Sequence, residues 1–459
     1  MALVRLLDAQ TLAVSWAVMA SDHATARGVV ESGAAGLAAR LHQLRAARGP
    51  APPRFTERVS ELIMIASGSR GGSSMLAELL RLSPHALHFR AEINPFLRLA
   101  GLGHPNSGTG SDRLDAAHLY ALNPAVRLAL EHDLALDVGT PAAQVDEEAV
   151  DRFALDVAWR LSVQWPEMDI DPFMLADAAC AVLPRSGAGD WNTERFHRRL
   201  LAELASRGIY MEEGFYDMPT SQPPMRPPGR ILVEEPPFVL TQPWRPADPH
   251  ALETMPLIVK TPSNVHRFDF LRALFPNARL RVLHLTRNPA ASVNGLIDGW
   301  RHHGFHSYRL PVPLRIAGYV DYRPADRHWW KFDLPPGWAD HIAEPLARVC
   351  AFQWRSSHEA IMAELDRSAI DCLRVRFEDL TRDADSRVTE LRRISSWLGI
   401  PFEGSLGRAA YSGIDPVVAT RAPRPRRWLD RAGEVRPVLG GEVAETARRL
   451  GYDSPDTWI

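Results

Sequence analysis

A short apolar strand, a glycine- and serine-rich turn and a helix follow one another near the start of this chain, and they constrain its fold most. Leu62–Ala66 is a continuous apolar run, as expected of a strand buried on both faces. Ser67–Gly72 supplies the turn, and Ser73–Leu82 carries apolar residues at helical spacing until Ser83-Pro84 ends the pattern. Backbone N–H groups converge in such a turn, at the positive end of the helix dipole. The segment therefore predicts an anion-binding site.

Alternation of strands and helices in the rest of the chain predicts the fold class. Further strand-like runs occur at Leu257–Lys260, Leu280–Leu285 and Cys372–Phe377. Helical patterns lie between them, at Val265–Leu274, Ala290–Trp300 and Leu346–Leu365. This order favours a parallel sheet covered by helices on both faces. We therefore expect an α/β fold with a P-loop-like turn, together with a mostly helical insertion.

Changes in sequence character suggest how the chain is divided. We expect residues 1–53 to form a helical segment and linker, and residues 54–111 and 243–459 to form the α/β domain. Residues 112–242, which include the proline-rich stretch Pro219–Pro228, would form an insertion that caps one end of the sheet. The apolar run Thr11–Ala20 is too short to span a bilayer. It favours an amphipathic helix over a signal peptide.

Composition limits the partners of this protein. The 459 residues include 53 Lys and Arg against 55 Asp and Glu, which gives a net charge of -2. No overall positive charge favours nucleic acid or an anionic membrane as a partner, so a bound anion must be held by local arginines. The cysteines Cys180, Cys350 and Cys372 are widely spaced and form no CxxC pair. We therefore expect no metal site, no disulfide framework and a cytoplasmic location.

Two segments carry arginines that suit a bound phosphate or sulfate. Arg70 lies inside the glycine-rich turn, and the hydroxyls of Ser73 and Ser74 follow it. The turn is not a Walker A loop, because no Lys-Ser/Thr pair follows its glycines. Arg287 ends a predicted strand ahead of Asn288-Pro289, a pair suited to begin a helix. The carboxyl end of a strand is where open α/β sheets bind their ligands.

Together, these segments resemble sulfotransferases that use 3′-phosphoadenosine 5′-phosphosulfate. The remaining family-like segments are Lys260-Thr261-Pro262, Arg376-Phe377-Glu378-Asp379-Leu380 and Trp397-Leu398-Gly399-Ile400. The resemblance implies that Arg70, Gly71, Gly72, Ser73 and Ser74 bind the 5′-phosphosulfate. It also implies that Arg287 and Ser292 bind the 3′-phosphate and that Arg426 and Arg427 lie in a basic loop over the nucleotide. This chain departs from the family pattern at Ser69, Gly71 and Gly295. In place of a serine at position 295, the 3′-phosphate is assigned to Ser292, with a backbone N–H as the alternative.

The resemblance also implies which residues take part in catalysis. Glu92 lies where protein-tyrosine sulfotransferases, which are similar here, carry a catalytic glutamate; the alternative is an ion pair with Arg90 or Arg98. His266 is the other candidate base, because cytosolic members use a histidine soon after the Lys-Thr dipeptide. Lys260 is the candidate that stabilises the bridging oxygen, unless it forms a structural ion pair.

We therefore expect an enzyme that moves a sulfuryl group from 3′-phosphoadenosine 5′-phosphosulfate to a hydroxyl or amine of a small-molecule or glycan acceptor, without a metal. Alternatives are a non-catalytic nucleotide-binding protein and a P-loop kinase of a small molecule. The aromatic residues Trp300, Trp329, Trp330 and Trp338 wall an acceptor pocket or belong to the core. The sequence leaves the acceptor and the oligomeric state open.

Overall fold

A computed structural model describes residues 24–147, 149–184, 191–218, 229, 231–412, 417–453 and 458. Contacts divide the chain into two compact units. Unit 1 comprises Met1–Thr56, Phe89–Gly108 and Tyr120–His250, and unit 2 comprises Glu57–His88, Thr109–Leu119 and Ala251–Ile459. The segments Thr11–Ala20 and Pro219–Pro228 lie outside the described residues.

A parallel sheet forms the centre of unit 2 and confirms the predicted α/β fold. Strand β1 (Glu61–Ala66) pairs with β5 (Leu257–Val259) on one side and with β6 (Arg279–Thr286) on the other. Strand β5 also pairs with β2 (Leu87–Phe89), and β6 with β9 (Cys372–Arg376). These pairings give the order β2-β5-β1-β6-β9. Every one of them is parallel. The carboxyl ends of these strands therefore lie at one edge of the sheet.

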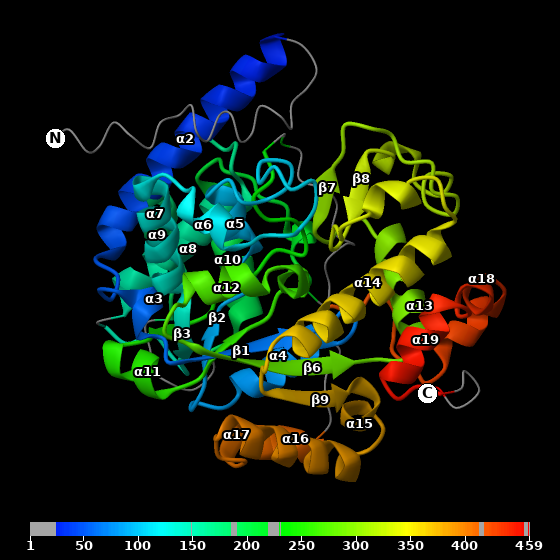
Figure 1. The fold of residues 1–459 in the computed structure, drawn as a ribbon. Coiled ribbons are helices and arrows are strands. Elements are labelled where there is room, and N and C mark those ends of the chain that lie inside the picture. The colour runs from blue at the N-terminus through cyan, green and yellow to red at the C-terminus, as the bar shows by residue number, and fades with distance from the viewer. Residues whose placement is uncertain are drawn as a thin grey trace. The chain divides into compact units, whose positions relative to one another are not determined.

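Alternation of side chains along the strands gives the sheet of unit 2 two covered faces. Ile65, Leu283 and Leu285 belong to an apolar cluster that includes residues of α4 (Ser73–Arg81), α16 (Ala384–Leu398) and α17 (Gly404–Ser412). On the other face, Nε2 of His284 lies 3.0 Å from Nδ1 of His358 in α14 (Leu346–Arg367). Figure 1 shows α14 on one side of β6 and β9, with α16 and α17 on the other.

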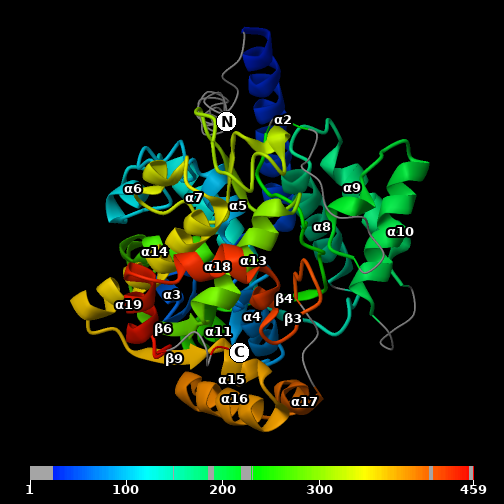
Figure 2. The ribbon, with the colours of Figure 1, turned by 90° about the vertical axis from the view of Figure 1, so that its right-hand side faces the viewer.

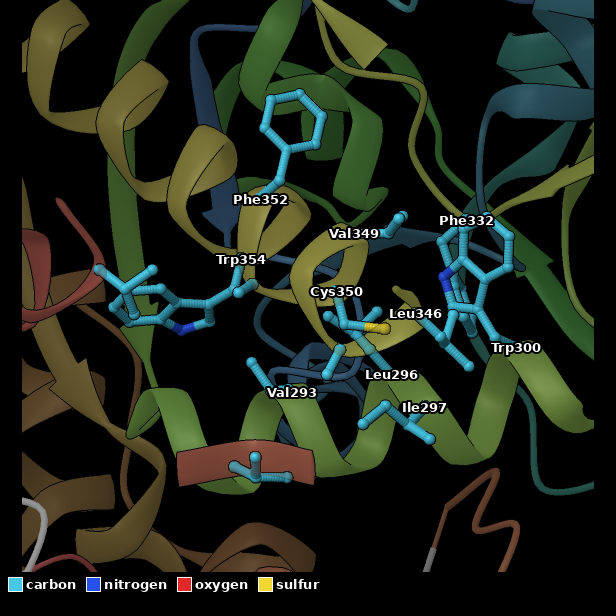
Figure 3. Packing of buried hydrophobic residues seen from close by; sticks show 14 of the residues in the cluster. Val293, Leu296, Ile297, Trp300, Phe332, Leu346, Val349, Cys350, Phe352 and Trp354 are labelled. Atoms are coloured by element: carbon cyan, nitrogen blue, oxygen red, sulfur yellow. The ribbon is translucent and has the colours of Figure 1, made fainter. Parts of the chain in front are cut away.

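A second apolar cluster joins α13 (Pro289–Arg301), α14, the hairpin β7 (Ser307–Arg309) and β8 (Trp329–Lys331), and the C-terminal helices. Figure 3 shows α13 and α14 packed together in this cluster. Trp300 and Trp330 are fully buried in it, with ring centroids 5.2 Å apart. These two tryptophans are therefore core residues. Figures 1 and 2 both show α19 (Glu442–Arg449) close to α14.

The other helices of unit 2 are short connections between these layers. They are η4 (Pro262–His266), α12 (Phe268–Leu274), η5 (Pro324–Asp326), η6 (Trp338–His341), α15 (Phe377–Thr381), η7 (Arg427–Arg431), α18 (Ala432–Val435) and η8 (Arg436–Val438). Three further helices contain a boundary between the units: α3 (Phe55–Arg58), α6 (Ala116–Tyr120) and α11 (Pro249–Thr254).

Unit 1 is mostly helical, as expected of most of its length. Its helices are α2 (Ala24–Arg48), α5 (Asn94–Leu99), α7 (Pro124–Asp137), α8 (Val150–Gln164), α9 (Pro172–Val182), α10 (Thr193–Ser206) and η3 (Glu213–Phe215). Strands β3 (Val138–Pro141) and β4 (Trp244–Pro246) pair antiparallel. Segment 89–108, which carries Glu92, belongs to this unit.

Buried ion pairs hold the helices of unit 1 together. Asp156 of α8 bonds with Arg48 at the end of α2, at 2.8 Å, and with Arg90. Arg160, one turn further along α8, bonds with Glu234 at 3.1 Å and with Asp137 at 3.5 Å. Burial alone would raise the pKa of Asp156, but Arg90 and Arg48 outweigh it and lower that pKa. Removing one partner would therefore leave an uncompensated buried charge.

Most of the predicted elements agree closely with the structure. The helical segment expected within residues 1–53 contains α2, and the helices predicted at Ala290–Trp300 and Leu346–Leu365 are α13 and α14. The single helix predicted over Val265–Leu274 is instead split into η4 and α12 at Arg267. In the part of the chain that the structure describes, no helix has the length and apolar character needed to cross a membrane.

Leu283 in the centre of β6 provides a test of this core. Its side chain is fully buried in the apolar cluster on one face of the sheet, so Leu283→Ala should lower the free energy of unfolding by about 2–5 kcal/mol. Leu429→Ala removes the same atoms from a side chain that is 43% exposed and should change stability by about 0.5 kcal/mol or less. Urea denaturation of both variants measures the difference. Equal losses for the two would contradict this description of the core.

Candidate functional site

The candidate site is built at the carboxyl edge of the sheet in unit 2. The turn 67–72 follows β1, Lys260 follows β5 and Arg287 follows β6. Phe377 and Glu378 come directly after β9. Parallel pairing of these strands brings together groups that are far apart in sequence, as expected for the ligand-binding edge of an open α/β sheet.

The backbone of the turn is tightly folded. The N–H of Gly71 donates to the carbonyl of Gly68 at 3.0 Å, and Gly72 has a φ of 99° at the N-cap of α4. A Cβ at Gly71 would lie 2.2 Å from Oγ of Ser67 and 2.8 Å from the carbonyl oxygen of Gly68. Glycine is therefore required at position 71 by space and at position 72 by both space and conformation. The result is a helix N-terminus whose first N–H groups can bind an anion.

Phe377 connects the turn with Arg287. A Cβ at Gly72 would lie 2.2 Å from Cδ2 of Phe377, so only glycine admits this ring so close to the turn. The guanidinium carbon of Arg287 lies 4.4 Å from the centroid of the same ring. Nη1 of Arg287 also donates to the carbonyl of Arg70 at 3.1 Å. These contacts hold the two predicted phosphate-binding segments against each other.

Burial lowers the pKa of Arg287, with the nearby Glu378 acting in the opposite direction. A guanidinium nevertheless keeps its charge in proteins. This half-buried charge is only partly solvated, so an anion near it is attracted more strongly than at an exposed arginine. Arg287 therefore has the properties of an anion ligand.

Glu378 fixes the start of α13 at the same edge. Its Oε1 accepts from the backbone N–H of Asn288 at 2.9 Å and from Nδ2 of Asn288 at 2.7 Å. Oδ1 of Asn288 caps the helix by accepting from the N–H of Ala291 at 2.8 Å, as its sequence position predicted. The hydroxyl of Tyr452 donates to Oε2 of Glu378 at 2.8 Å. This network sets the direction of α13 and hence the position of Ser292.

Ser292 lies on the first turns of α13 and is fully buried. Its Oγ has no hydrogen-bond partner among the described residues. A buried hydroxyl without a partner is costly in a folded protein, and a bound oxygen atom would satisfy it. A phosphate oxygen therefore fits the chemistry of this group.

Arg70 occupies a specific place in the turn. Its φ of 62° is unusual for a residue other than glycine. Nη1 donates to the carbonyl of Val418 at 2.9 Å, and the guanidinium carbon lies 4.9 Å from the ring centroid of Phe305. The segment before η7 and the segment before β7 thus direct the guanidinium of Arg70.

A buried lysine fixes the segment that leads to Phe305, the residue whose ring contacts Arg70. Nζ of Lys331 donates to the carbonyl oxygens of His302, of Gly304 at 2.8 Å and of Gly299 at 3.4 Å. Phe305 and Phe332, which both have positive φ, pack with ring centroids 5.4 Å apart. Strained backbone of this kind persists only where the surrounding structure holds it, and it is concentrated at functional sites.

Lys260 and His266, the other predicted residues of unit 2, differ in environment. Lys260 is half-buried at the end of β5, next to the strand that carries the turn. Burial lowers the pKa of His266 to about 4, although Asp112 opposes this effect. His266 is therefore neutral at pH 7, and its low pKa makes it a weak base.

Glu92 is placed in unit 1, between β2 and α5, and is half-buried. Arg90, two positions earlier, does bond strongly, but with Asp156 and through its backbone N–H with Oδ2 of Asp137 at 3.0 Å. Arg98 lies 3.8 Å from Glu235. Each arginine that the sequence offered as a partner of Glu92 thus has another carboxylate close to it.

Arg426 and Arg427 lie at the start of η7, in unit 2. Arg426 is exposed, whereas Arg427 bonds with Asp298 of α13 at 2.5 Å. Arg431 bonds with the other oxygen of Asp298 at 2.8 Å. Asp298, which sequence analysis did not single out, therefore attaches this basic segment to the helix that also carries Ser292.

Asp333 is the second acidic residue that sequence analysis missed. It is 1% exposed and its side chain approaches Ser69 and Ser357, so it lies behind the turn. The available sequence signal for its burial was its position directly after the largely aromatic run Trp329-Trp330-Lys331-Phe332, because residues next to buried aromatic side chains are often buried with them. Within the described residues, no group of His, Cys, Asp and Glu side chains is arranged to hold a metal ion.

Comparison with known proteins gives one informative match. A model of the sulfotransferase family matches residues 63–404 of the chain. None of the curated proteins is similar to it in sequence. Among solved structures, the sulfotransferase domain from the curacin biosynthetic pathway is 13% identical, with a TM-score of 0.35 over 86% of this chain and 99% of that chain. Sulfotransferase STF9 from Mycobacterium avium is 15% identical, with a TM-score of 0.33 over 96% and 90% of the two chains.

Gly72 provides a test of the packing at the turn. Gly72→Ala places a Cβ against Phe377 and forces a residue with a side chain to a φ of 99°. We expect a loss of about 1–3 kcal/mol in the free energy of unfolding, measured by thermal and urea denaturation. Phe377→Ala in the same protein should recover part of that loss, because it removes the clash but not the strained φ.

Gly433→Ala is the matched control for this substitution. Gly433 lies in a short helix of the same unit and a Cβ there would meet nothing within 4 Å. Its replacement should leave stability unchanged or slightly raised. If Gly72→Ala were tolerated as well as Gly433→Ala, the packing of Phe377 on the turn would be wrong.

Proposed function

Because the chain belongs to the sulfotransferase family, we propose that it moves a sulfuryl group from 3′-phosphoadenosine 5′-phosphosulfate to a hydroxyl or amine of an organic acceptor. The acceptor would be a small molecule or a glycan. The observation that carries this proposal is the pairing of two arginine-bearing segments at one edge of the sheet, with Arg287 hydrogen-bonded to the carbonyl of Arg70. Two anion sites next to each other suit a donor that carries one phosphate on the 3′ position and another on the 5′ position of its ribose.

We assign the donor-binding residues from their surroundings. The backbone N–H groups of Gly71–Ser74, with the hydroxyls of Ser73 and Ser74 and the guanidinium of Arg70, would bind the 5′-phosphosulfate. Arg287 would bind the 3′-phosphate together with Ser292, whose buried Oγ lacks a partner among the described residues. Arg426 and Arg427 would cover the nucleotide from the segment that Asp298 attaches to α13. This set provides positive charge at both phosphates without a metal ion.

The proposed reaction is a single in-line displacement. The acceptor oxygen or nitrogen attacks sulfur and loses its proton to a base, while the bond from sulfur to the bridging phosphate oxygen breaks. The products are the sulfated acceptor and adenosine 3′,5′-bisphosphate. Lys260 and Arg70 would stabilise the charge that develops on the bridging oxygen.

Glu92 is the base that we propose. The alternative base is His266, whose pKa burial lowers to about 4. Glu92 is half-buried, and the arginines nearest to it in sequence have other carboxylates beside them. Glu92 lies where the chain resembles protein-tyrosine sulfotransferases that carry a catalytic glutamate, and this resemblance supports the assignment.

Selectivity between nucleotides tests the donor assignment. Calorimetric titration should show binding of adenosine 3′,5′-bisphosphate in the absence of Mg²⁺ and weaker binding of ATP with Mg²⁺. Arg70→Ala and Arg287→Ala should each weaken binding of the bisphosphate by about 10-fold to 150-fold, because a hydrogen bond to a charged group contributes about 1.5–3 kcal/mol.

Arg348→Ala is the matched control, since this arginine of α14 is largely exposed and makes only a long ion pair with Glu344. It should leave the affinity unchanged. A preference for ATP with Mg²⁺ would instead support the kinase alternative. Unchanged affinity in both Arg70→Ala and Arg287→Ala would overturn the donor site.

Turnover tests the assignment of the base. Glu92→Gln keeps the size of the side chain but cannot accept a proton, so it should retain bisphosphate binding while turnover falls by about 10²-fold to 10⁴-fold. The assay would follow adenosine 3′,5′-bisphosphate release with an acceptor found by screening phenols, sugars and amines. Glu131→Gln, which changes a surface residue of α7, serves as the control. Near-normal turnover of Glu92→Gln would return the role to His266, and no turnover of the unmodified protein by any acceptor would favour a binding protein.

A further inference from the structure

A buried carboxyl group lies directly behind the glycine-rich turn. Asp333 follows β8 and is 1% exposed. Its Oδ2 accepts from Oγ of Ser357 in α14 at 3.4 Å, and the side chain of Ser69 approaches the same carboxyl group. Its Oδ1 has no hydrogen-bond partner among the described residues. The carboxyl group is thus in contact with the turn but withdrawn from solvent.

The contacts of Ser357 confirm how close this group is to the turn. A Cβ at Gly68 would lie 3.5 Å from Cβ of Ser357 and 3.7 Å from its Oγ. Gly68 and Ser69 are the residues that lead from β1 into the predicted anion site, and Ser69 precedes Arg70. A change of charge on Asp333 would therefore act on the turn across a buried region, where electrostatic effects are large.

The charges around Asp333 do not neutralise it. Asp112, whose charge raises the pKa of Asp333, is itself an acid and bonds with Arg267 at 2.9 Å and with the hydroxyl of Tyr308. On β8, Nζ of Lys331 bonds with backbone carbonyl oxygens rather than with the carboxyl group of Asp333.

The guanidinium of Arg70 is directed to the carbonyl of Val418. On α14, Cys350 is buried and its thiol stays neutral, because burial raises its pKa well above the ordinary value. The groups that act on the carboxyl group of Asp333 thus include the hydroxyls of Ser69 and Ser357 and a second acid, Asp112.

We propose that Asp333 is a positioning residue that must carry a proton when an anion binds at the turn, so that donor binding is coupled to the protonation of this one carboxyl group. The inference rests on the proposed function, because it takes the donor anion to lie at the turn. Asp333 itself touches no substrate. In its protonated form it donates a hydrogen bond to a serine hydroxyl and adds no negative charge behind the anion site.

The sign of the coupling follows from the charges. Burial, with a further contribution from Asp112, raises the pKa of Asp333 to about 7, so the group is part ionised near neutral pH. An anion bound at the turn disfavours the carboxylate and raises this pKa further. Donor binding therefore takes up a proton above about pH 7, and affinity falls as pH rises, by at most about tenfold per pH unit.

Calorimetric titration with adenosine 3′,5′-bisphosphate between about pH 7 and about pH 9 tests this coupling. In the unmodified protein, affinity should fall by about 10-fold or more over this range, and binding should take up protons, measured in buffers of different ionisation enthalpy. Asp333→Asn, which is uncharged and of equal size, should bind as tightly at pH 9 as at pH 7 and take up fewer protons. Asp366→Asn, at an exposed position of the same unit, should behave like the unmodified protein.

The outcomes separate this inference from the proposed function. If the bisphosphate binds but Asp333→Asn and the unmodified protein show parallel pH curves, the coupling is wrong while the donor site stands. If the unmodified protein binds no bisphosphate at any pH, the donor site and this inference both fall. Should Asp333→Asn fold poorly, proton uptake by the unmodified protein decides alone, and an uptake of zero near pH 8 overturns the inference.

Discussion

The contact between Phe377 and Gly72 is the constraint on which the candidate site depends. Phe377 stands at the end of β9 and Gly72 at the end of the turn after β1, and a ring can approach so closely only where no Cβ intervenes. Arg287, at the end of β6 between them, lies over the same ring. Three strand ends are thereby held in one arrangement, which gives the anion site its shape before any ligand binds.

Buried polar groups fix the surroundings of this contact. Glu378 joins the end of β9 to Asn288, the N-cap of α13, and Lys331 joins the end of α13 to the segment that carries Phe305. Because each of these groups is buried, loss of its partner would be costly, and the arrangement is correspondingly rigid. The arrangement of the candidate site therefore depends on these buried hydrogen bonds.

Much of unit 2 could be predicted from sequence because its local patterns and its tertiary packing agree. The apolar run before Ala66 predicted β1, and Asn288-Pro289 predicted the start of α13. The split of the helix predicted over Val265–Leu274 could not be foreseen, because backbone hydrogen bonds within Pro262–Arg267, rather than side-chain spacing, set it. Likewise, Trp300 and Trp330 fit a core and an acceptor wall equally well in sequence, and only burial distinguishes the two.

The sequence by itself determined the strand, turn and helix around Arg70, the second arginine at position 287 and the order of family-like segments, because these are local patterns of a few residues. Only the tertiary structure decided that Arg287 bonds with the backbone of Arg70, that Ser292 is buried without a hydrogen-bond partner among the described residues, and that Asp333 lies behind the turn. The physical reason is that these relations join residues far apart in the chain. They arise when parallel strands align their carboxyl ends and the helices between them cover the sheet.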